Sequence, residues 1–149
     1  MAENKEKKFK PIIGLAIISF LICGLFFPLI VTGIAQVFFP YQANGEIVQI
    51  NGKDIGSNLI AQTFTLPIFW HPRNDSASGV DPDITLQDAY SQIPRISNAT
   101  GISEASLTNI VNQHQEGTLW IFGNPYVNVL RINLELIKEY PSIYIEFVG

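Results

Sequence analysis

The chain begins with a long unbroken apolar segment. No charged residue occurs between Pro11 and Phe39, and the polar side chains in that stretch are Ser19, Thr32 and Gln36, with the weakly polar Cys23. About 20 apolar residues are enough for a helix to cross the hydrocarbon core of a membrane. The pattern therefore predicts a single-pass transmembrane helix over residues 11–39. Residues 1–10 are expected to be a disordered basic tail.

Small residues form a stripe on this predicted helix. Pro28 removes one backbone hydrogen bond in mid-helix and should kink it, a cost that packed neighbouring helices can relieve. On a helical wheel the small or weakly polar residues lie within about 80° of one another, a spread that lets a second helix approach closely. They are Gly24, Pro28, Thr32 and Ala35, with Gln36 close to the same face. We predict a helix-packing interface here; the alternative is that Gly and Pro are simply commoner in membrane helices.

Beyond Pro40 the pattern changes to short segments separated by turn residues. Residues 46–50 and 53–55 flank Asn51-Gly52, a dipeptide typical of two-residue hairpin turns, so a β-hairpin is predicted. Residues 59–69 are apolar without a clear period and are expected to mix strand and loop. Residues 70–82 are rich in Ser, Asp, Pro and Gly and predict a loop.

Two short helices should follow the loop. Thr85 is a candidate N-cap for a helix that runs to about Gln92 and is interrupted at Pro94. Ser103 is a candidate N-cap for a second helix that Gly117 closes. The apolar face of this second helix consists of residues at helical spacing; they are Leu107, Ile110, Val111 and His114.

The last part of the chain combines strand and helix patterns. Residues 119–122 predict a strand, and residues 126–136 start with alternation that suits a strand and end with a pattern that also suits a helix. Residues 40–149 are therefore expected to form a small mixed α/β domain.

Charge separates the two sides of the apolar segment. Four lysines and two glutamates precede it, whereas residues 40–149 hold eleven acidic and five basic side chains. Because positive residues beside a membrane helix remain in the cytoplasm, the N-terminus should be inside and residues 40–149 should be an extracytoplasmic domain. The acidic balance also argues against nucleic acid as a partner, since its phosphates would be repelled.

A cleaved signal peptide is the alternative interpretation of the N-terminal segment. Gly33 and Ala35 would suit a small-residue cleavage site, but the apolar run is about twice as long as a signal core and contains Pro28. A membrane anchor therefore explains the pattern better. The single cysteine, Cys23, lies within the predicted span, so the outer domain should fold without a disulfide.

The sequence lacks the motifs of catalysis and ion conduction. It contains no GxxxxGK[ST] or GxGxxG phosphate-binding motif, no charged residue within the span and no TVGYG-type filter. His71 and His114 are far apart and have no cysteine beside them, so no metal site is predicted. The acidic residues Asp75, Asp81, Asp83 and Asp88 miss the EF-hand spacing and are interpreted as a solvated loop. We do not expect an enzyme, and the chain alone is neither pump nor channel.

Four segments taken in order carry a family resemblance. They are Pro28-Leu-Ile-Val-Thr-Gly-Ile-Ala-Gln-Val-Phe-Phe-Pro40 with Gln42-Ala-Asn-Gly45; Gly56-Ser-Asn-Leu-Ile-Ala-Gln62 with Phe69-Trp70, Arg73 and Ser76-Ala77; Ser78-Gly-Val-Asp-Pro-Asp-Ile-Thr85 with Gln92-Ile-Pro-Arg95; and Gly123-Asn-Pro-Tyr-Val-Asn-Val-Leu130 with Asn133-Leu134. Together they resemble the C subunit of the bacterial and archaeal Kdp potassium-transporting ATPase. The resemblance implies a cell-membrane subunit of a high-affinity, ATP-driven potassium uptake complex. Its partners would be a channel-like potassium-binding subunit and an ATP-hydrolysing P-type subunit.

The sequence departs from that family in three places. A long Gly/Asn-rich insertion is missing between Ala77 and Ser78, Asp83 stands where a histidine or another residue is common, and residues 137–149 extend past the usual end. The alternative interpretations are a stand-alone membrane-tethered extracytoplasmic binding module and, third, a secreted enzyme released by signal cleavage.

The family is described as a catalytic chaperone that raises the affinity of the ATP-hydrolysing subunit for ATP. That description invites a nucleotide site near Gln113 and Gln115. We expect no cofactor to bind directly, because an acidic domain without a phosphate cradle should repel a polyanion. The predicted side of the membrane is also the wrong one for cytoplasmic ATP. ATP is therefore expected to act through the partner subunit.

Overall fold

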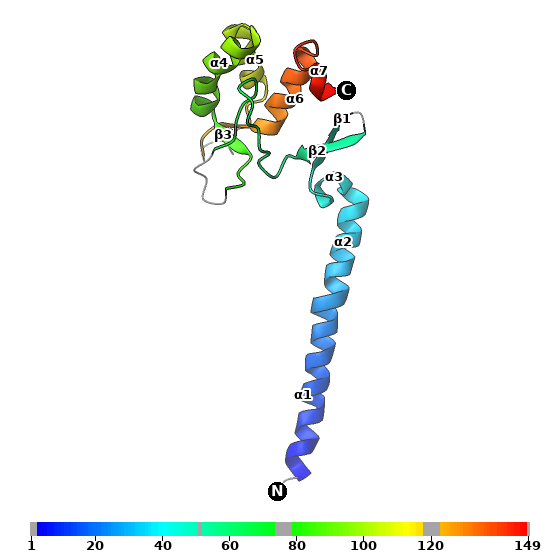
Figure 1. The fold of residues 1–149 in the computed structure, drawn as a ribbon. Helices are drawn as coiled ribbons and strands as arrows, with labels where there is room; N and C mark the ends of the chain where they lie inside the picture. Colours follow the sequence, from blue (N-terminus) through cyan, green and yellow to red (C-terminus); the bar gives the residue numbers. More distant parts are fainter. Residues whose placement is uncertain (1–2, 51, 74–78, 118–122, 149) are drawn as a thin grey trace. The chain divides into compact units, whose positions relative to one another are not determined.

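The structure is a computed structural model that describes residues 3–50, 52–73, 79–117 and 123–148. It divides into two compact units, Met1–Asn44 and Gly45–Gly149, which we call the N-terminal unit and the α/β domain. The N-terminal unit consists of α1 (Glu3–Leu21), a π-helical segment η1 (Ile22–Phe26), α2 (Phe27–Phe38) and the short α3 (Pro40–Ala43) (Figure 1). Residues Phe9–Phe38 form a helix long and apolar enough to cross a membrane.

The helix begins earlier than its composition indicated. Glu3 to Lys10 belong to α1, so the prediction of a disordered tail is wrong for these residues. The reason is that helix propagation costs little once a long downstream helix has formed, and the Glu and Lys residues of this segment are good helix formers. At the other end α2 stops at Phe38, and Phe39 has left the helical region with φ −137° and ψ 53°.

Pro28 is accommodated by a change in helix type. The backbone N–H of Phe27 donates to the carbonyl of Ile22, five residues earlier, which is the π-helical pattern. A proline ring clashes with the carbonyl four residues before it and supplies no N–H. A wider turn just before Pro28 relieves that clash. The irregularity expected at Pro28 therefore takes the form of a π-helical turn.

The α/β domain starts with the predicted hairpin. Strands β1 (Ile47–Ile50) and β2 (Lys53–Ser57) are antiparallel, and Ile50 faces Lys53 across a two-residue turn. Gly52 has a φ of +79°, a backbone conformation that glycine adopts without steric cost. The hairpin prediction is confirmed.

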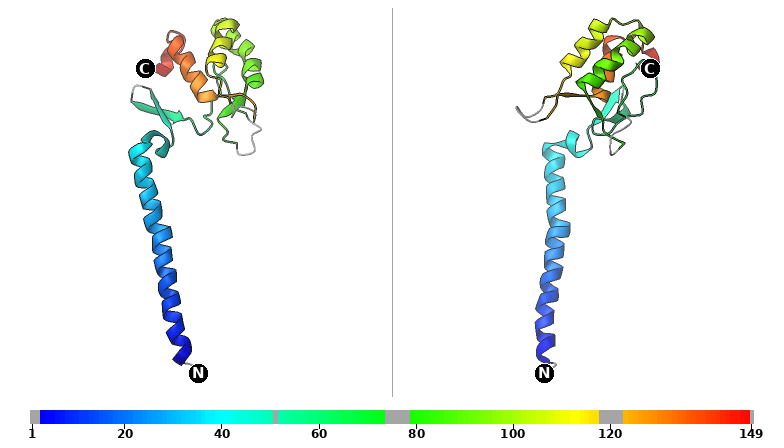
Figure 2. Two further views of the ribbon diagram at one scale, coloured as in Figure 1. Left: turned by 180° about the vertical axis from the view of Figure 1, so that it is seen from behind. Right: turned by 90° about the vertical axis from the view of Figure 1, so that its left-hand side faces the viewer.

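A second pair of strands leads into the main helices. Strand β3 (Asp83–Thr85) pairs antiparallel with β4 (Tyr126–Asn128), and these strands run directly into α4 (Leu86–Thr100) and α6 (Val129–Glu139). Helix α5 (Glu104–Gln113) packs against both α4 and α6 (Figure 2). The core side chains come from these helices, from β3 and β4, from the loop before β3 and from the segment after α6; the largest are Trp70, Tyr144, Ile84, Ile96, Leu107, Ile110, Ile132 and Leu136. The expectation of a small mixed α/β domain is thus confirmed.

Helix α4 differs from its prediction because Pro94 does not interrupt it. The helix continues for 15 residues to Thr100, and Gly101 ends it with a φ of +77°. Pro94 is exposed, whereas Ile93 and Ile96 beside it are buried, so burial of the apolar face outweighs the lost hydrogen bond. The two N-caps are confirmed: Thr85 accepts from the N–H of Asp88 and Ser103 from that of Ser106, each at 3.1 Å.

Three other segments differ from expectation or remain untested. Residues 59–69 contain no strand, and α5 ends at Gln113 instead of continuing to Gly117. The strand predicted at residues 119–122 lies outside the described residues. The change from strand to helix within residues 126–136 occurs at Asn128, as the pattern allowed.

The C-terminal segment is part of the core. Tyr144 is fully buried, and its hydroxyl donates to the carbonyl of Ile68 at 2.9 Å. Phe147, in the short helix α7 (Ile145–Val148), meets Phe69 edge-on with ring centroids 5.1 Å apart. The residues after α6 therefore complete the domain instead of trailing from it.

Candidate functional site

The predicted packing stripe lies on the exposed surface of the N-terminal helix. Gly24 is in η1, and Pro28, Thr32, Ala35 and Gln36 are in α2, where no residue is buried. A helical wheel assumes regular α-helix, and the π-helical segment has more residues per turn, so the angle between Gly24 and the later residues differs from the wheel value. The stripe is regular only from Pro28 to Gln36.

Gly24 and Gln36 in this stripe have neighbours within the N-terminal unit. A Cβ added at Gly24 would lie 3.7 Å from the ring of Phe20, an ordinary contact, so a larger side chain fits within the chain itself. The amide of Gln36 exchanges hydrogen bonds with that of Asn44, at 3.3 Å in each direction. Gln36 therefore has a partner within its own unit, beside the end of the helix.

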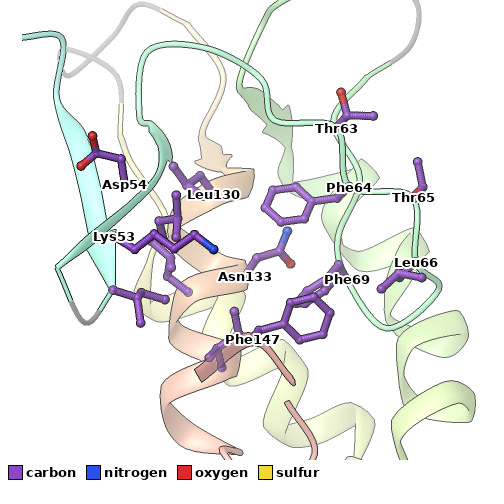
Figure 3. A pocket seen from close by; sticks show the side chains of 14 residues that line it. Lys53, Asp54, Thr63, Phe64, Thr65, Leu66, Phe69, Leu130, Asn133 and Phe147 are labelled. Carbon is purple, nitrogen blue, oxygen red and sulfur yellow. The ribbon is translucent and has the colours of Figure 1, made fainter. Parts of the chain in front are cut away.

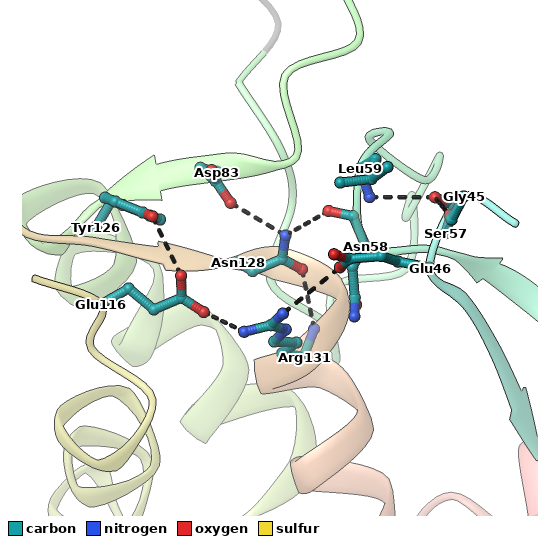
Figure 4. Close-up of polar contacts among 10 residues, drawn as sticks. All are labelled: Gly45, Glu46, Ser57, Asn58, Leu59, Asp83, Glu116, Tyr126, Asn128 and Arg131. Atoms are coloured by element: carbon teal, nitrogen blue, oxygen red, sulfur yellow. Dashed lines mark hydrogen bonds and ion pairs between the residues drawn. The ribbon is translucent and has the colours of Figure 1, made fainter. Parts of the chain in front are cut away.

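A polar network centred on Asn128 connects distant parts of the α/β domain (Figure 4). The Asn128 Oδ1 atom caps α6 by accepting from the N–H of Arg131 at 3.3 Å. Its Nδ2 atom donates to the carbonyl of Asn58 at 2.8 Å and to a carboxylate oxygen of Asp83 at 3.0 Å. Asn128 is only 5% exposed, so these bonds replace contacts that water would otherwise supply.

Arg131 extends the network through two ion pairs. Its guanidinium contacts Glu116 directly and lies 3.8 Å from a carboxylate oxygen of Glu46. Glu116 also accepts from the Tyr126 hydroxyl at 3.1 Å, and this hydrogen bond is the main reason why the pKa of Tyr126 is raised. Burial raises the pKa of Asp83, which the hydrogen bond from Asn128 partly offsets.

Glu46 has an unusual backbone conformation within this network. Its φ of +49° is the only positive value at a non-glycine residue in the described part of the chain. Such a conformation is strained and persists only when neighbouring contacts hold it. Here the N–H of Asn58 donates to the Glu46 carbonyl at 3.2 Å, and Arg131 holds the side chain. The network thus fixes the first residues after the N-terminal unit.

The two histidines considered for metal binding do not converge. The His71 ring nitrogen lies 2.9 Å from the carbonyl of Leu66, and a His114 ring nitrogen lies 3.0 Å from that of Ile110. No cluster of three or more His, Cys, Asp or Glu side chains in the described ranges could hold a metal ion. The interpretation of the acidic residues as a solvated loop is wrong for Asp83, which lies in β3 and is half-buried, and for Asp88, which lies in the first turn of α4. Gln113 and Gln115 are exposed near the end of α5.

Asn128, Arg131 and Glu46 do not stand out in the sequence as site residues. Only Asn128 carried a local signal, because an asparagine before an apolar helical pattern is a typical N-cap. The ion pairs of Arg131 join residues 15 and more positions apart, and a single sequence gives no sign of such a pairing.

The chain is similar to known proteins along most of its length. A family model described as "KdpC: K+-transporting ATPase, c chain" matches residues 9–76 and 74–138. The potassium-transporting ATPase KdpC subunit of Koribacter versatilis is 31% identical over 178 aligned positions, which cover 85% of this chain and 92% of that protein. The corresponding protein of Bacillus cereus is 32% identical over 189 positions, covering 91% and 98%.

These alignments also bear on two of the three departures from the family, the missing insertion and the C-terminal extension. The alignments are longer than the 149 residues of this chain, so the relatives contain residues that this chain lacks. The two matched segments meet at residues 74–76, beside the predicted site of the missing insertion, and the match ends at residue 138. Because the matches cover most of the N-terminal helix and most of the α/β domain, the chain belongs to the KdpC family, the c chain of K+-transporting ATPases.

Proposed function

We propose that this protein is a non-catalytic subunit of an ATP-driven potassium uptake complex, anchored in the cell membrane by residues 9–38. The observation that carries the proposal is the family match, which covers the apolar helix and most of the α/β domain. In this role the chain binds two larger subunits, one that conducts potassium and one that hydrolyses ATP, and stabilises their assembly.

Gentle detergent extraction tests this proposal. A tagged form of the full chain should bring down two larger membrane proteins, whereas a stand-alone tethered module would be purified alone.

Replacing Gly24 by leucine should weaken this co-purification severalfold, because a bulky side chain prevents close approach of a partner helix.

Gly33→Leu is the matched control. No atom lies within 4 Å of a Cβ built at Gly33, and at Gly24 only the ordinary Phe20 contact occurs, so neither substitution should disturb the helix itself. On a helical wheel Gly33 lies on the opposite side from Pro28, Thr32 and Ala35, so Gly33→Leu should co-purify nearly as well as the natural chain. Equal losses at the two positions would contradict a specific packing face.

We also propose that the N-terminus is cytoplasmic and the α/β domain is extracytoplasmic. Positive charge precedes the helix, and residues 40–149 are acidic. Protease added to cells stripped of their outer barriers should therefore digest residues 40–149 and spare an N-terminal tag. Protection of the domain in this assay would reverse the proposed orientation.

The influence on ATP is proposed to be indirect. By stabilising an assembled conformation of the pump, the subunit would raise ATP affinity at a distant site, and such coupling is typically about 1–3 kcal/mol. The full chain in detergent should then show no saturable ATP binding by calorimetry. Removing the chain from the complex should weaken potassium-stimulated ATP hydrolysis. Saturable ATP binding that is lost when Gln113 and Gln115 are replaced together by alanine would establish a direct site instead.

A further inference from the structure

The α/β domain contains an apolar pocket that the polar network does not use (Figure 3). It is a cavity of about 420 Å³ between the hairpin, the loop at residues 63–66, α6 and α7. This volume lies in the range of about 300–1,000 Å³ that small-molecule sites have. Its walls are mainly apolar, and the main apolar side chains are Phe64, Leu66, Phe69, Leu130, Leu134 and Phe147.

Two hydrogen-bond donors face this apolar cavity. Strand residues alternate between faces, so Lys53 and Asp54 point to opposite sides of β2. Figure 3 shows the Lys53 side chain extending across the pocket with its ammonium group directed toward Asn133, while the Asp54 carboxylate points away. Asp54 instead accepts from the side chain of Gln49 at 2.6 Å.

The Lys53 ammonium is not neutralised by the domain. In the part of the chain that the structure describes, no carboxylate lies within ion-pair distance of it. Lys53 is an exposed residue, so its long side chain lies along the apolar rim of the pocket and places the positive ammonium group at the entrance. It gives the pocket a local preference for an anionic group.

Asn133 supplies the second donor from the wall of the pocket. It is 1% exposed, its Oδ1 atom accepts from the N–H of Trp70 at 2.8 Å, and its Nδ2 atom donates to the carbonyl of Trp70 at 2.9 Å. An amide nitrogen carries two hydrogens, and among the described residues no acceptor receives the second. Lys53 and Asn133 can thus both donate to a ligand, and Thr63 and Thr65 add hydroxyl groups on the loop side of the pocket.

We propose that this pocket binds the carboxylate of a single-chain fatty acid, with the acyl chain against the apolar walls and the carboxylate between Lys53 and Asn133. An apolar body with one anionic acceptor matches the lining better than a purely apolar or a cationic ligand. Phe147 lies beyond residue 138, where the family match ends, so one wall of the pocket is formed by a segment outside that match. The proposal does not depend on the role in potassium uptake.

Fluorescence quenching in nanodiscs of zwitterionic lipid can test this site in the full chain. Phe147→Trp places a reporter in the wall, and the unsubstituted chain, which contains Trp70 and Trp120, gives the background quenching to subtract. The quencher is a fatty acid with bromine at the end of its acyl chain. Quenching of the reporter should saturate as the ratio of fatty acid to lipid rises. Leu66→Trp, on the loop side of the pocket, provides a second reporter in case the first disturbs α7.

Charge recognition is tested by a matched pair of lysine substitutions. Lys53→Gln should raise the half-quenching concentration about threefold or more, because it removes a charge-assisted hydrogen bond. Lys138→Gln removes an exposed lysine that pairs with Glu135 outside the pocket and should leave the value unchanged. The corresponding brominated alcohol should require a higher concentration than the acid.

Several results would overturn the proposal. Quenching that rises without saturation at both reporters would show only partition into the lipid. Equal potency of alcohol and acid, or no effect of Lys53→Gln, would show that the pocket does not recognise a carboxylate. Quenching by brominated phospholipid but not by fatty acid would identify a different ligand.

Discussion

Replacing Asn133 by leucine should lower the free energy of unfolding of the α/β domain by about 2–5 kcal/mol. The side chain of Asn133 satisfies both the N–H and the carbonyl of Trp70, a residue that is itself fully buried. Leucine is similar in size but leaves both main-chain groups without a partner, and each such group costs about 1–3 kcal/mol. The measurement is denaturant unfolding of the full chain in mild detergent, followed by tryptophan fluorescence.

Asn112→Leu is the matched control for this substitution. Asn112 is exposed on α5, where its side chain accepts from the Tyr90 hydroxyl at 2.6 Å. Water can replace that bond, so the loss should stay below about 1 kcal/mol. If the two variants lose similar amounts of unfolding free energy, the contact between Asn133 on α6 and the loop at Trp70 does not stabilise the domain.

Local chemistry explains which parts of the fold the sequence predicted. The hairpin follows from the Asn-Gly dipeptide at 51–52, since asparagine and glycine tolerate the positive φ that a two-residue hairpin turn requires. The helix starts follow from the caps Thr85 and Ser103. These signals act within four residues, so they are readable without a tertiary structure. The same holds for the N-terminal helix, since its length and composition alone are sufficient.

The mispredictions arise where distant contacts overrule local preference. Pro94 should end a helix, but the burial of Ile93 and Ile96 keeps α4 continuous. The π-helical turn before Pro28 is a backbone adjustment that residue type alone does not specify. Strand β3 has only three residues, too few to show a period, and it exists because β4 pairs with it.

The candidate sites also differ in whether their residues are close together in the sequence. The stripe around Gly24 and Pro28 was visible because its residues are close in sequence, although its role in packing stays a prediction. Asn128 contacts a residue 70 positions away, and Asn133 one 63 positions away. The polar network and the pocket therefore became apparent only when the fold brought these residues together.

Replacing Tyr144 by alanine should cost about 3–5 kcal/mol of unfolding free energy, as is typical when a buried aromatic side chain is removed. Tyr144 is fully buried, its ring lies 5.2 Å from that of Phe69, and burial raises the pKa of its hydroxyl well above the usual range. The hydroxyl therefore remains protonated and continues to donate to the carbonyl of Ile68.

The tail variants decide whether residues beyond the family match are part of the domain. Ile145→Ala is the control, since Ile145 is 71% exposed and its loss should change stability by about 0.5 kcal/mol or less. The loss of unfolding free energy for Tyr144→Phe should lie between those for Ile145→Ala and Tyr144→Ala. This substitution removes the hydroxyl but keeps the ring, and an unsatisfied carbonyl costs about 1–3 kcal/mol. The unfolding midpoints of the three variants should therefore follow the order Ile145→Ala, Tyr144→Phe, Tyr144→Ala from highest to lowest. If Tyr144→Ala unfolds at the same denaturant concentration as Ile145→Ala, the tail contributes nothing to the core, and the wall that Phe147 gives the pocket would lose its support.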